Sequence, residues 1–264
     1  MRIQVVCTMM HQTDFSNVLK MNLQTDAVIA NQADTNERNE IMHNGHRYLM
    51  ITTDTRGASL NRNIGISNSS ADIIVFSDDD QTFVDGYEQM VLEAFERYPD
   101  ADAIKFYCQS TNPERQLSYM NPGCWKKAVR TDLSSAGVLG FAVKRAFLEK
   151  NNIRFNEEIG PGKEICCGED TSFIVDLFKN KANIYLSPEL ISYVGQTEST
   201  WFKGFNEQYF ISVGYVYATI YGALACLVAL RRCIVMRKKT KDFSSFQMYK
   251  LMFKGIIKQR KTSK

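Results

Sequence analysis

The segment ADIIVFSDDDQ (residues 71–81) joins a hydrophobic run to three consecutive aspartates. Its apolar part is short and rich in branched residues, which is typical of a strand that is buried on both faces of a parallel sheet. In open sheets of this kind, ligands bind in the crevice at the carboxyl ends of the strands. Asp78, Asp79 and Asp80 occupy that place in the sequence. The segment therefore predicts an α/β fold with an acidic ligand site at the end of a strand.

Short apolar runs alternate with helically spaced apolar residues along the first half of the chain. This alternation predicts an α/β sheet that is mostly parallel. A further helix is expected at 168–180, a strand at 183–186 and a turn at Ser187 and Pro188. The other predicted strands cover residues 3–8, 27–30, 48–53, 72–77 and 101–107, and the other predicted helices cover residues 58–67 and 85–98.

The composition limits the class of protein. With 264 residues, 44% hydrophobic and 23% charged, the chain has room for one large domain and an appendage. Its seven cysteines form no CxxC pair and are odd in number, so we expect reduced thiols in the cytosol rather than a disulfide framework. The apolar run in MRIQVVCTMM (residues 1–10) is too short for a signal peptide, so we expect the body to be cytosolic.

The aspartates at residues 78–80 suit a metal. Alternate residues of an extended segment share a face, so Asp78 and Asp80 are expected to point together while Asp79 points away. Two adjacent carboxylates repel each other unless a cation or protons lie between them. Oxygen ligands favour Mg²⁺ or Mn²⁺, which also takes phosphate oxygens from a substrate. The alternative is a solvated acidic turn that caps the next helix.

A second acidic motif, GED at residues 168–170, begins a predicted helix. Acidic residues in a first turn also stabilise a helix dipole, and that interpretation is the alternative to a catalytic one. A carboxylate beside an attacking hydroxyl can act as a general base. The three histidines lie far in sequence from both acidic motifs, and the adjacent Cys166 and Cys167 are expected to serve packing.

The order of these motifs resembles that of a known family. The segments RGASLNRNIGISNSSADIIVFSDDD and RFNEEIGPG, followed by GED, are similar to family 2 glycosyltransferases, most of all to bacterial enzymes that build capsule or O-antigen polysaccharide. The similarity covers residues 3 to 208. It implies a Rossmann-like GT-A catalytic domain over 1–208 and a metal-dependent, inverting, hexosyltransferase-like enzyme. Such an enzyme moves a sugar from a nucleotide-diphosphate donor to a saccharide acceptor.

The resemblance also implies roles for individual residues. Asp78 and Asp80 match the metal and diphosphate motif of the family, DxD, and Asp170 matches the general base, with Glu169 as the alternative. Gly57, like Gly65, has helix packing as an alternative role. The residues matched to the donor pocket are Thr8, Arg56, Gly57, Arg62, Asn63 and Asp78, with Arg56 or Arg62 as phosphate contacts.

One departure from the family concerns the nucleotide base. Asn31 and Gln32 stand where the family usually has an acidic pair. An amide offers both a donor and an acceptor to a pyrimidine edge. Uracil and thymine would both fit such an amide, so we expect a UDP- or dTDP-linked donor. Further along, Trp201 and Phe202 are candidates to stack on an acceptor sugar, or to pack in the interior.

The segment 209–264 is expected to attach the enzyme to a membrane. Residues 209–230 carry no charge, whereas residues 231–264 hold 12 Lys or Arg and one acid, Asp242. A single span would place this basic segment outside, against the positive-inside rule. Residues 243–258 place Phe246, Tyr249, Phe253 and Ile256 on one helical side, so we expect monotopic binding to the anionic inner face of the plasma membrane, near a lipid-linked acceptor. A true span and soluble packing are the alternatives.

Two other functions compete with glycosyl transfer. The same metal site would serve a nucleotide-sugar or phosphate hydrolase, which would turn over the donor without an acceptor. A non-enzymatic protein would use the basic segment to bind nucleic acid or membrane. Nucleic-acid binding would be recognised by salt-sensitive retention on DNA or RNA. No nucleic-acid motif is present in the sequence, and the apolar interleaving favours lipid.

Overall fold

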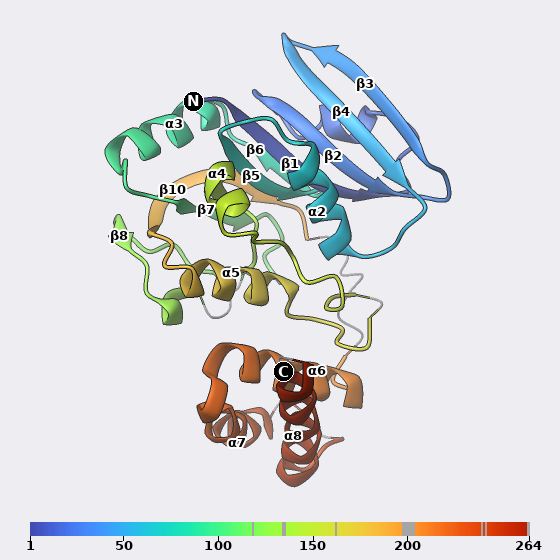
Figure 1. Ribbon diagram of the computed structural model, residues 1–264, viewed down its shortest axis with the longest axis vertical. Helices are drawn as coiled ribbons and strands as arrows, with labels where there is room; N and C mark the ends of the chain where they lie inside the picture. Colours follow the sequence, from blue (N-terminus) through green and yellow to red (C-terminus); the bar gives the residue numbers. More distant parts are fainter. Residues whose placement is uncertain are drawn as a thin grey trace.

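The computed structural model describes residues 1–117, 119–133, 136–161, 163–196, 204–238, 240 and 242–262. Within these residues one sheet of ten strands forms the body, and three helices lie below it in Figure 1. The strands are β1 (Ile3–Met10), β2 (Asp26–Gln32), β3 (Glu37–His43), β4 (His46–Thr53), β5 (Ile73–Asp78), β6 (Gln81–Phe83), β7 (Ala103–Ser110), β8 (Lys126–Lys127), β9 (Phe141–Lys144) and β10 (Ile184–Val194). The helices are α1 (Ser16–Leu19), α2 (Ala58–Asn68), α3 (Tyr87–Arg97), α4 (Arg145–Lys150), α5 (Glu169–Lys179), α6 (Glu207–Tyr221), α7 (Ala225–Met236) and α8 (Ser245–Thr262), with short 3-10 turns at Arg130–Leu133 and Gly222–Leu224.

The order of the strands is β3-β4-β2-β1-β5-β9-β7-β10-β6, and β8 pairs with β10. The neighbouring strands β4, β2, β1 and β5 are parallel, and so are β7 and β10. Antiparallel pairing joins β3 to β4, β9 to both β5 and β7, and β10 to both β6 and β8. The predicted strands and the predicted α/β class are confirmed, but the sheet is mixed rather than mostly parallel, because β9 inserts between β5 and β7 in the opposite direction.

The two faces of the sheet carry separate cores. Alternate residues of β1 divide between them, with Val5 in the core that includes α3 and Val6 in the core that includes α2, α4 and α5. Both faces are therefore covered, which explains why the central strands read as continuous apolar runs. Their carboxyl ends remain uncovered by helix packing, and the register pairs Thr8 of β1 with Asp78 of β5 at that edge.

Two expectations about the sheet were wrong. Ser187 and Pro188 form no chain-reversing turn, because β10 runs from Ile184 to Val194 with register shifts between Leu186 and Ser192. The irregularity accommodates a proline, which cannot donate a ladder hydrogen bond. The hairpin of β3 and β4 was not predicted, since β3 is a mostly exposed edge strand without a hydrophobic pattern.

Helices α6, α7 and α8 pack on one another around a core of their own. A Cβ added at Gly214 of α6 would lie 1.9 Å from the carbonyl oxygen of Met252, so the backbones of α6 and α8 are in close contact. The predicted boundary between 208 and 209 falls inside the first turn of α6. The group adjoins the body through Gly168, where a Cβ would lie 2.0 Å from Val216, and through the Cys166 backbone N–H, which donates to Ser212 Oγ at 2.9 Å.

The uncharged segment is divided between two helices. By length and composition, Glu207–Met236 is apolar enough to cross a membrane. Its most apolar 18-residue window has a mean hydropathy of 1.8, and 44% of that window is buried. Gly222 has φ +54 and stands where α6 ends, and α7 then packs back on α6 and α8. The predicted apolar side of residues 243–258 is also divided, because Ile256 is buried whereas Phe246 and Phe253 are exposed. The face of α8 that packs on its neighbours comprises Met248, Leu251, Met252, Gly255 and Ile256.

Candidate active site

The first aspartate of the triplet ends strand β5 beside the end of β1. Asp78 Oδ1 accepts a hydrogen bond of 2.8 Å from Thr8 Oγ1, and the Asp78 backbone N–H donates to Gln81 Oε1 at 3.1 Å. The side chain of Asp78 is 33% exposed. Its carboxylate is thus fixed by the sheet edge while one side stays open to a ligand.

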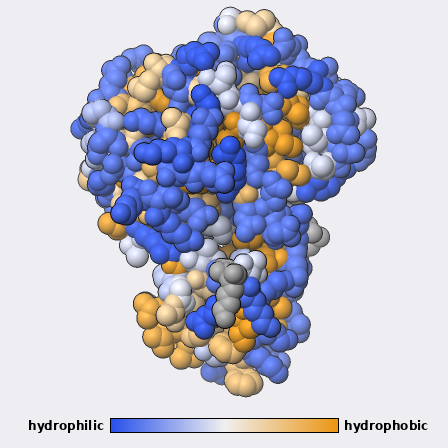
Figure 2. Space-filling model, viewed as in Figure 1, coloured by the Kyte–Doolittle hydropathy of each residue, from blue (hydrophilic) through white to orange (hydrophobic). Residues whose placement is uncertain are grey.

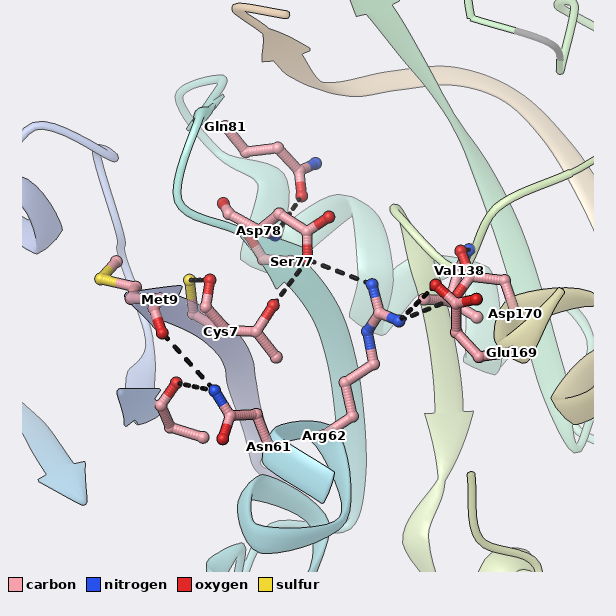
Figure 3. A network of polar contacts seen from close by, with 12 residues as sticks. Cys7, Met9, Asn61, Arg62, Ser77, Asp78, Gln81, Val138, Glu169 and Asp170 are labelled. Atoms are coloured by element: carbon pink, nitrogen blue, oxygen red, sulfur yellow. Dashed lines mark hydrogen bonds and ion pairs between the residues drawn. The ribbon is translucent and has the colours of Figure 1, made fainter. Parts of the chain in front are cut away.

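A buried arginine joins the two acidic motifs. Arg62 of α2 donates from Nη2 to Asp78 Oδ1 at 3.3 Å and from Nη1 to Asp170 Oδ1 at 2.7 Å (Figure 3). Its guanidinium also lies 5.3 Å from the centre of the Phe155 ring, and its side chain is 6% exposed. Burial by itself would lower the pKa of Arg62, but the charges of Asp170, Asp78 and Glu169 outweigh it and raise that pKa. Arg62 is therefore a permanent cation at the centre of the site.

Helix α5 presents its first turn to this arginine. Gly168 has φ +104, a conformation that favours glycine, and it places Glu169 and Asp170 at the start of the helix. Asp170 Oδ2 accepts a hydrogen bond of 3.1 Å from the Val138 backbone N–H, so both of its oxygens are held. Burial, followed by the charge of Asp170, raises the pKa of Glu169 to about 7. Both base candidates therefore lie beside Arg62.

The other two aspartates carry perturbed carboxyl groups. Burial and the charges of Asp78 and Asp80 raise the pKa of Asp79 to about 6, and burial also raises the pKa of Asp80. Asp80 Oδ2 accepts a hydrogen bond of 3.0 Å from the Gln196 backbone N–H. The carboxylates of the triplet repel one another, and a divalent cation bound to their oxygens would reduce that repulsion. Among the described residues no group of three or more His, Cys, Asp or Glu is placed to hold a metal. Asp78 and Asp80 have the oxygen chemistry that suits Mg²⁺ or Mn²⁺, and such an ion would need further ligands from a substrate.

Two cavities meet at this site. The strand-end cavity, of about 520 Å³, is lined by Thr8, Gln32, Arg56, Gly57 and the three aspartates, among others. The Lys105 cavity, of about 420 Å³, is lined by Lys105, Tyr119, Cys166, Cys167 and Thr171, among others. Residues that line both include Arg62, Asp78, Arg115, Glu169, Asp170 and Gln196. The two acidic motifs thus stand at the junction of two spaces, each large enough for part of a substrate.

Three residues matched to the donor lie together in the strand-end cavity. Gln32 Oε1 accepts a hydrogen bond of 2.9 Å from the Gly57 backbone N–H, and Gly57 has φ +132. Arg56 donates to the Asp54 carbonyl at 3.1 Å and forms an ion pair with Asp34. Gly57 is therefore required by the backbone turn. Gly65, by contrast, permits close packing, since its Cβ would lie 2.3 Å from Val6 Cγ1.

Two other predicted donor residues lie elsewhere. Asn31 is fully buried, and its amide bonds the Gln12 backbone and Thr52 Oγ1, so it faces the interior while Gln32 faces the cavity. Asn63 bonds the backbone of Phe155 and the carboxylate of Glu157, and it lines neither cavity. These contacts give both asparagines a structural role in this fold. Trp201 and Phe202 lie outside the described residues.

Several residues of the site were not found from the sequence. Lys105 is 3% exposed, and its ammonium group donates to the Leu139 carbonyl and lies 5.0 Å from the Tyr119 ring centre. The sequence signal that could have identified Lys105 is a lysine within a strand that is predicted to be buried. Within the described residues, three buried atoms that line the cavities have no hydrogen-bond partner, namely Asn61 Oδ1, Tyr119 Oη and Gln196 Oε1. Buried polar atoms are nearly always bonded, so these three are unsatisfied hydrogen-bonding positions beside the cavities.

The cysteine pair borders the site. Cys166 and Cys167 line the Lys105 cavity, and Ser212 Oγ donates to Cys166 Sγ at 3.3 Å. The hydrogen bond from Cys167 lowers the pKa of the Cys166 thiol. The expected packing role of this pair stays a prediction.

Comparison with known proteins identifies the family. Residues 19–162 match the sequence model of glycosyl transferase family 2, a range that includes Arg62 and the aspartate triplet and ends before α5. No curated protein matches the chain. The fold is similar to that of residues 1–349 of S. aureus TarS in complex with UDP-GlcNAc, with a TM-score of 0.66 and 13% identity over 91% of this chain and 74% of that one. The complex of the same TarS fragment with UDP has a TM-score of 0.64 and 13% identity, over 90% of this chain and 72% of that one. The structure of S. aureus TarS has a TM-score of 0.62 and 12% identity, over 92% of this chain and 44% of that one. With more than half of its length in the family match and its strands arranged as in a GT-A glycosyltransferase, the chain belongs to glycosyl transferase family 2.

Proposed function

We propose that this family member is a metal-dependent, inverting glycosyltransferase that moves a sugar from a nucleotide-diphosphate donor to a saccharide acceptor. One observation carries the proposal, namely that Arg62 bonds both Asp78 and Asp170 where the two cavities meet. A donor in one cavity and an acceptor in the other would then react beside a fixed cation and a carboxylate. This arrangement supplies both the charge stabilisation and the proton acceptor that glycosyl transfer requires.

The nucleotide is assigned to the strand-end cavity. Gln32 offers its amide to a pyrimidine edge there, and Arg56 and Arg62 line the same cavity as cations for phosphate. The single amide of Gln32 could bond the edge of either a uracil or a thymine base. The solved structure of TarS with UDP-GlcNAc, which shares the fold, supports UDP as the nucleotide to test first.

Asp78 and Asp80 are assigned to the metal. When bound there, Mn²⁺ or Mg²⁺ would neutralise charge on the diphosphate leaving group. Arg62 contributes charge from the protein itself, because it remains protonated and already contacts Asp78. The diphosphate would draw Arg62 toward its own oxygens and loosen the hold of Arg62 on Asp170.

Asp170 is assigned the role of general base, and the acceptor is assigned to the Lys105 cavity. The acceptor hydroxyl oxygen forms a bond to the anomeric carbon while the bond from that carbon to the diphosphate oxygen breaks. The diphosphate leaves with the electron pair, and Asp170 takes the hydroxyl proton. Attack from the face opposite the leaving group inverts the anomeric carbon in a single displacement.

The basic segment and the apolar helices support the membrane location in the proposed biological setting. We assign the enzyme to bacterial surface polysaccharide synthesis, of capsule or O-antigen type, at the inner face of the plasma membrane. A lipid-linked saccharide is the acceptor in this assignment, because it would explain a catalytic body joined to helices with exposed apolar and basic residues.

The test is a screen of UDP- and dTDP-linked sugars with Mn²⁺ or Mg²⁺, measured by thermal shift and by donor turnover. Asp80→Asn should abolish metal-dependent donor binding, whereas Asp170→Asn should keep binding and lose transfer. Asp242→Asn, which changes an exposed carboxylate in the loop before α8, is the matched control. Donor turnover that never depends on a saccharide acceptor would contradict transfer and favour the hydrolase alternative.

A further inference from the structure

Helix α7 is apolar on two opposite faces. One face packs inside the group of three helices through Ala225, Ala229, Cys233 and Met236. On the opposite face, Leu227, Leu230 and Ile234 are 67%, 49% and 64% exposed. The exposed arginines Arg231 and Arg232 lie on the same helix, so α7 combines an outer apolar face with positive charge. In the part of the chain that the structure describes, nothing covers this second face.

The exposed apolar surface extends beyond α7. Eight of the fifteen exposed large hydrophobic side chains of the described residues lie between 224 and 257, so these helices hold most of that surface. In Figure 2 they appear as a cluster of orange residues over α7. Soluble monomers seldom gather exposed apolar residues in this way without a binding function. The outer-face residues are Leu224, Leu227, Leu230, Ile234 and Val235 near α7, and Phe246, Phe253 and Ile257 on α8.

Basic residues are interleaved with this surface. Arg231, Arg237 and Lys238 are exposed on or just after α7, and Lys250 and Lys254 are exposed on α8. Asp242 is the only acidic residue in the whole of 222–264. Apolar side chains with cations beside them fit the boundary between acyl chains and anionic headgroups.

We propose that the outer face of α7 is the surface by which this protein binds an anionic lipid bilayer. Helix α7 would lie along the interface with Leu227, Leu230 and Ile234 among the acyl chains, while neighbouring arginines and lysines contact lipid phosphates. The aromatic residues of α8 would add to this surface, but they do not define it. The inference rests on the membrane location proposed above and names the face responsible.

Two other occupants fit less well. A second copy of the chain on this face would bring two strongly basic segments together, and like charges repel. A transmembrane span is disfavoured because the apolar segment turns back at Gly222 and the inner face of α7 is already buried on its neighbours. An anionic bilayer offers acyl chains to the exposed apolar side chains of α7 and anionic headgroups to the basic side chains beside them.

The bilayer contact would also be coupled to the catalytic site. Ser212 of α6 bonds Cys166, and Val216 of α6 packs on Gly168, directly before Glu169 and Asp170. Helices fixed at a membrane would therefore support the start of α5. This arrangement suits an acceptor whose anchor lies in the same bilayer.

The experiment measures co-sedimentation of the full chain with phosphatidylcholine vesicles, with and without phosphatidylglycerol. We expect at least tenfold stronger binding to the anionic vesicles, and at least tenfold loss in the variant that combines Leu227→Ser, Leu230→Ser and Ile234→Ser. The control combines Met42→Ser, Met120→Ser and Val129→Ser, three exposed hydrophobic residues outside these helices, and it should bind like the wild type. Arg231→Gln with Arg237→Gln should reduce only the part of binding that depends on phosphatidylglycerol.

Each other outcome overturns the proposal in its own way. If the serine variant folds and binds as the wild type does, another surface contacts the bilayer. If the chain dimerises in solution through this face and ignores vesicles, the occupant is a second copy. If the wild type binds no vesicle, both the face and the membrane location are wrong, whereas donor turnover measured on the same samples still tests the transferase separately.

Discussion

Arg62 on α2 and Asp170 on α5 form a partly buried ion pair with an Nη1–Oδ1 distance of 2.7 Å. The same guanidinium reaches Asp78 at 3.3 Å, so one side chain connects the strand-end aspartate to the base candidate. In the absence of donor, Arg62 partly neutralises both carboxylates and fixes their separation. We interpret it as a positioning residue whose partner changes when a diphosphate enters.

Replacement of Arg62 should affect stability and transfer together. Arg62→Met leaves the partly exposed carboxylates of Asp170 and Asp78 without their cation, which should lower the unfolding free energy by about 1–3 kcal/mol. Arg62→Lys keeps the charge but cannot bond two carboxylates in a fork, so kcat should fall by about 100-fold while folding is largely retained. Chemical denaturation and single-turnover transfer measure the two effects. Arg47→Gln, which breaks the exposed pair with Glu40, is the control and should cost less than about 1 kcal/mol.

Asp170 and Glu169 can be distinguished by parallel variants. Asp170→Asn should lower kcat for transfer by at least about 1000-fold while donor affinity stays within a few-fold, because a neutral amide cannot accept the hydroxyl proton. Glu169→Gln should keep most of the transfer rate. Transfer is followed with radiolabelled donor, and binding by calorimetry. The reverse pattern, with Glu169→Gln inactive and Asp170→Asn active, would move the base to Glu169.

The raised pKa of Glu169 predicts how stability depends on pH. The folded chain keeps this proton up to about pH 7, whereas the unfolded chain releases it near the ordinary value of 4.5. Between these values the folded state binds more protons, so the unfolding free energy should fall as the pH rises. Glu169→Gln should flatten this slope and stabilise the ligand-free protein at pH 8 by up to about 3 kcal/mol. Urea unfolding at pH 5.5 and pH 8 checks the slope, and Glu96→Gln, an exposed carboxylate on α3, should leave it unchanged.

The two amides at the end of β2 should behave differently. Gln32→Ala should raise the KM for a UDP-linked donor by about tenfold, with little change in kcat, because the side chain lines the strand-end cavity. Asn31→Ala should instead lower the unfolding free energy by about 2 kcal/mol and leave KM nearly unchanged, because it removes three hydrogen bonds of a buried side chain. Steady-state kinetics and thermal unfolding of both variants measure this contrast. An Asn31→Ala enzyme with normal stability and weakened donor binding would show that the base contact lies on Asn31.

Local sequence patterns determined much of the molecule. The apolar runs predicted β1, β2, β4, β5 and β7, and helical spacing predicted α2, α3 and α5. These predictions succeed because a strand buried on both faces appears as a continuous apolar run, and an amphipathic helix as apolar residues at helical spacing, within a short stretch of sequence. The edge strand β3 left no such record because it is mostly exposed and has no hydrophobic pattern. The direction and position of β9 could not be predicted because its partners, β5 and β7, are distant in the sequence.

Tertiary packing decided how the side chains are used. The sequence by itself determined an α/β chain with two acidic motifs in order, followed by an apolar and then a basic segment. Only the fold decided that Gln32 faces a cavity while Asn31 faces the interior, that Arg62 stands between Asp78 and Asp170, and that α7 rather than α8 carries the main exposed apolar stripe. The physical reason is that residue type and spacing are encoded locally, whereas the direction and burial of a side chain depend on which distant segments pack beside it.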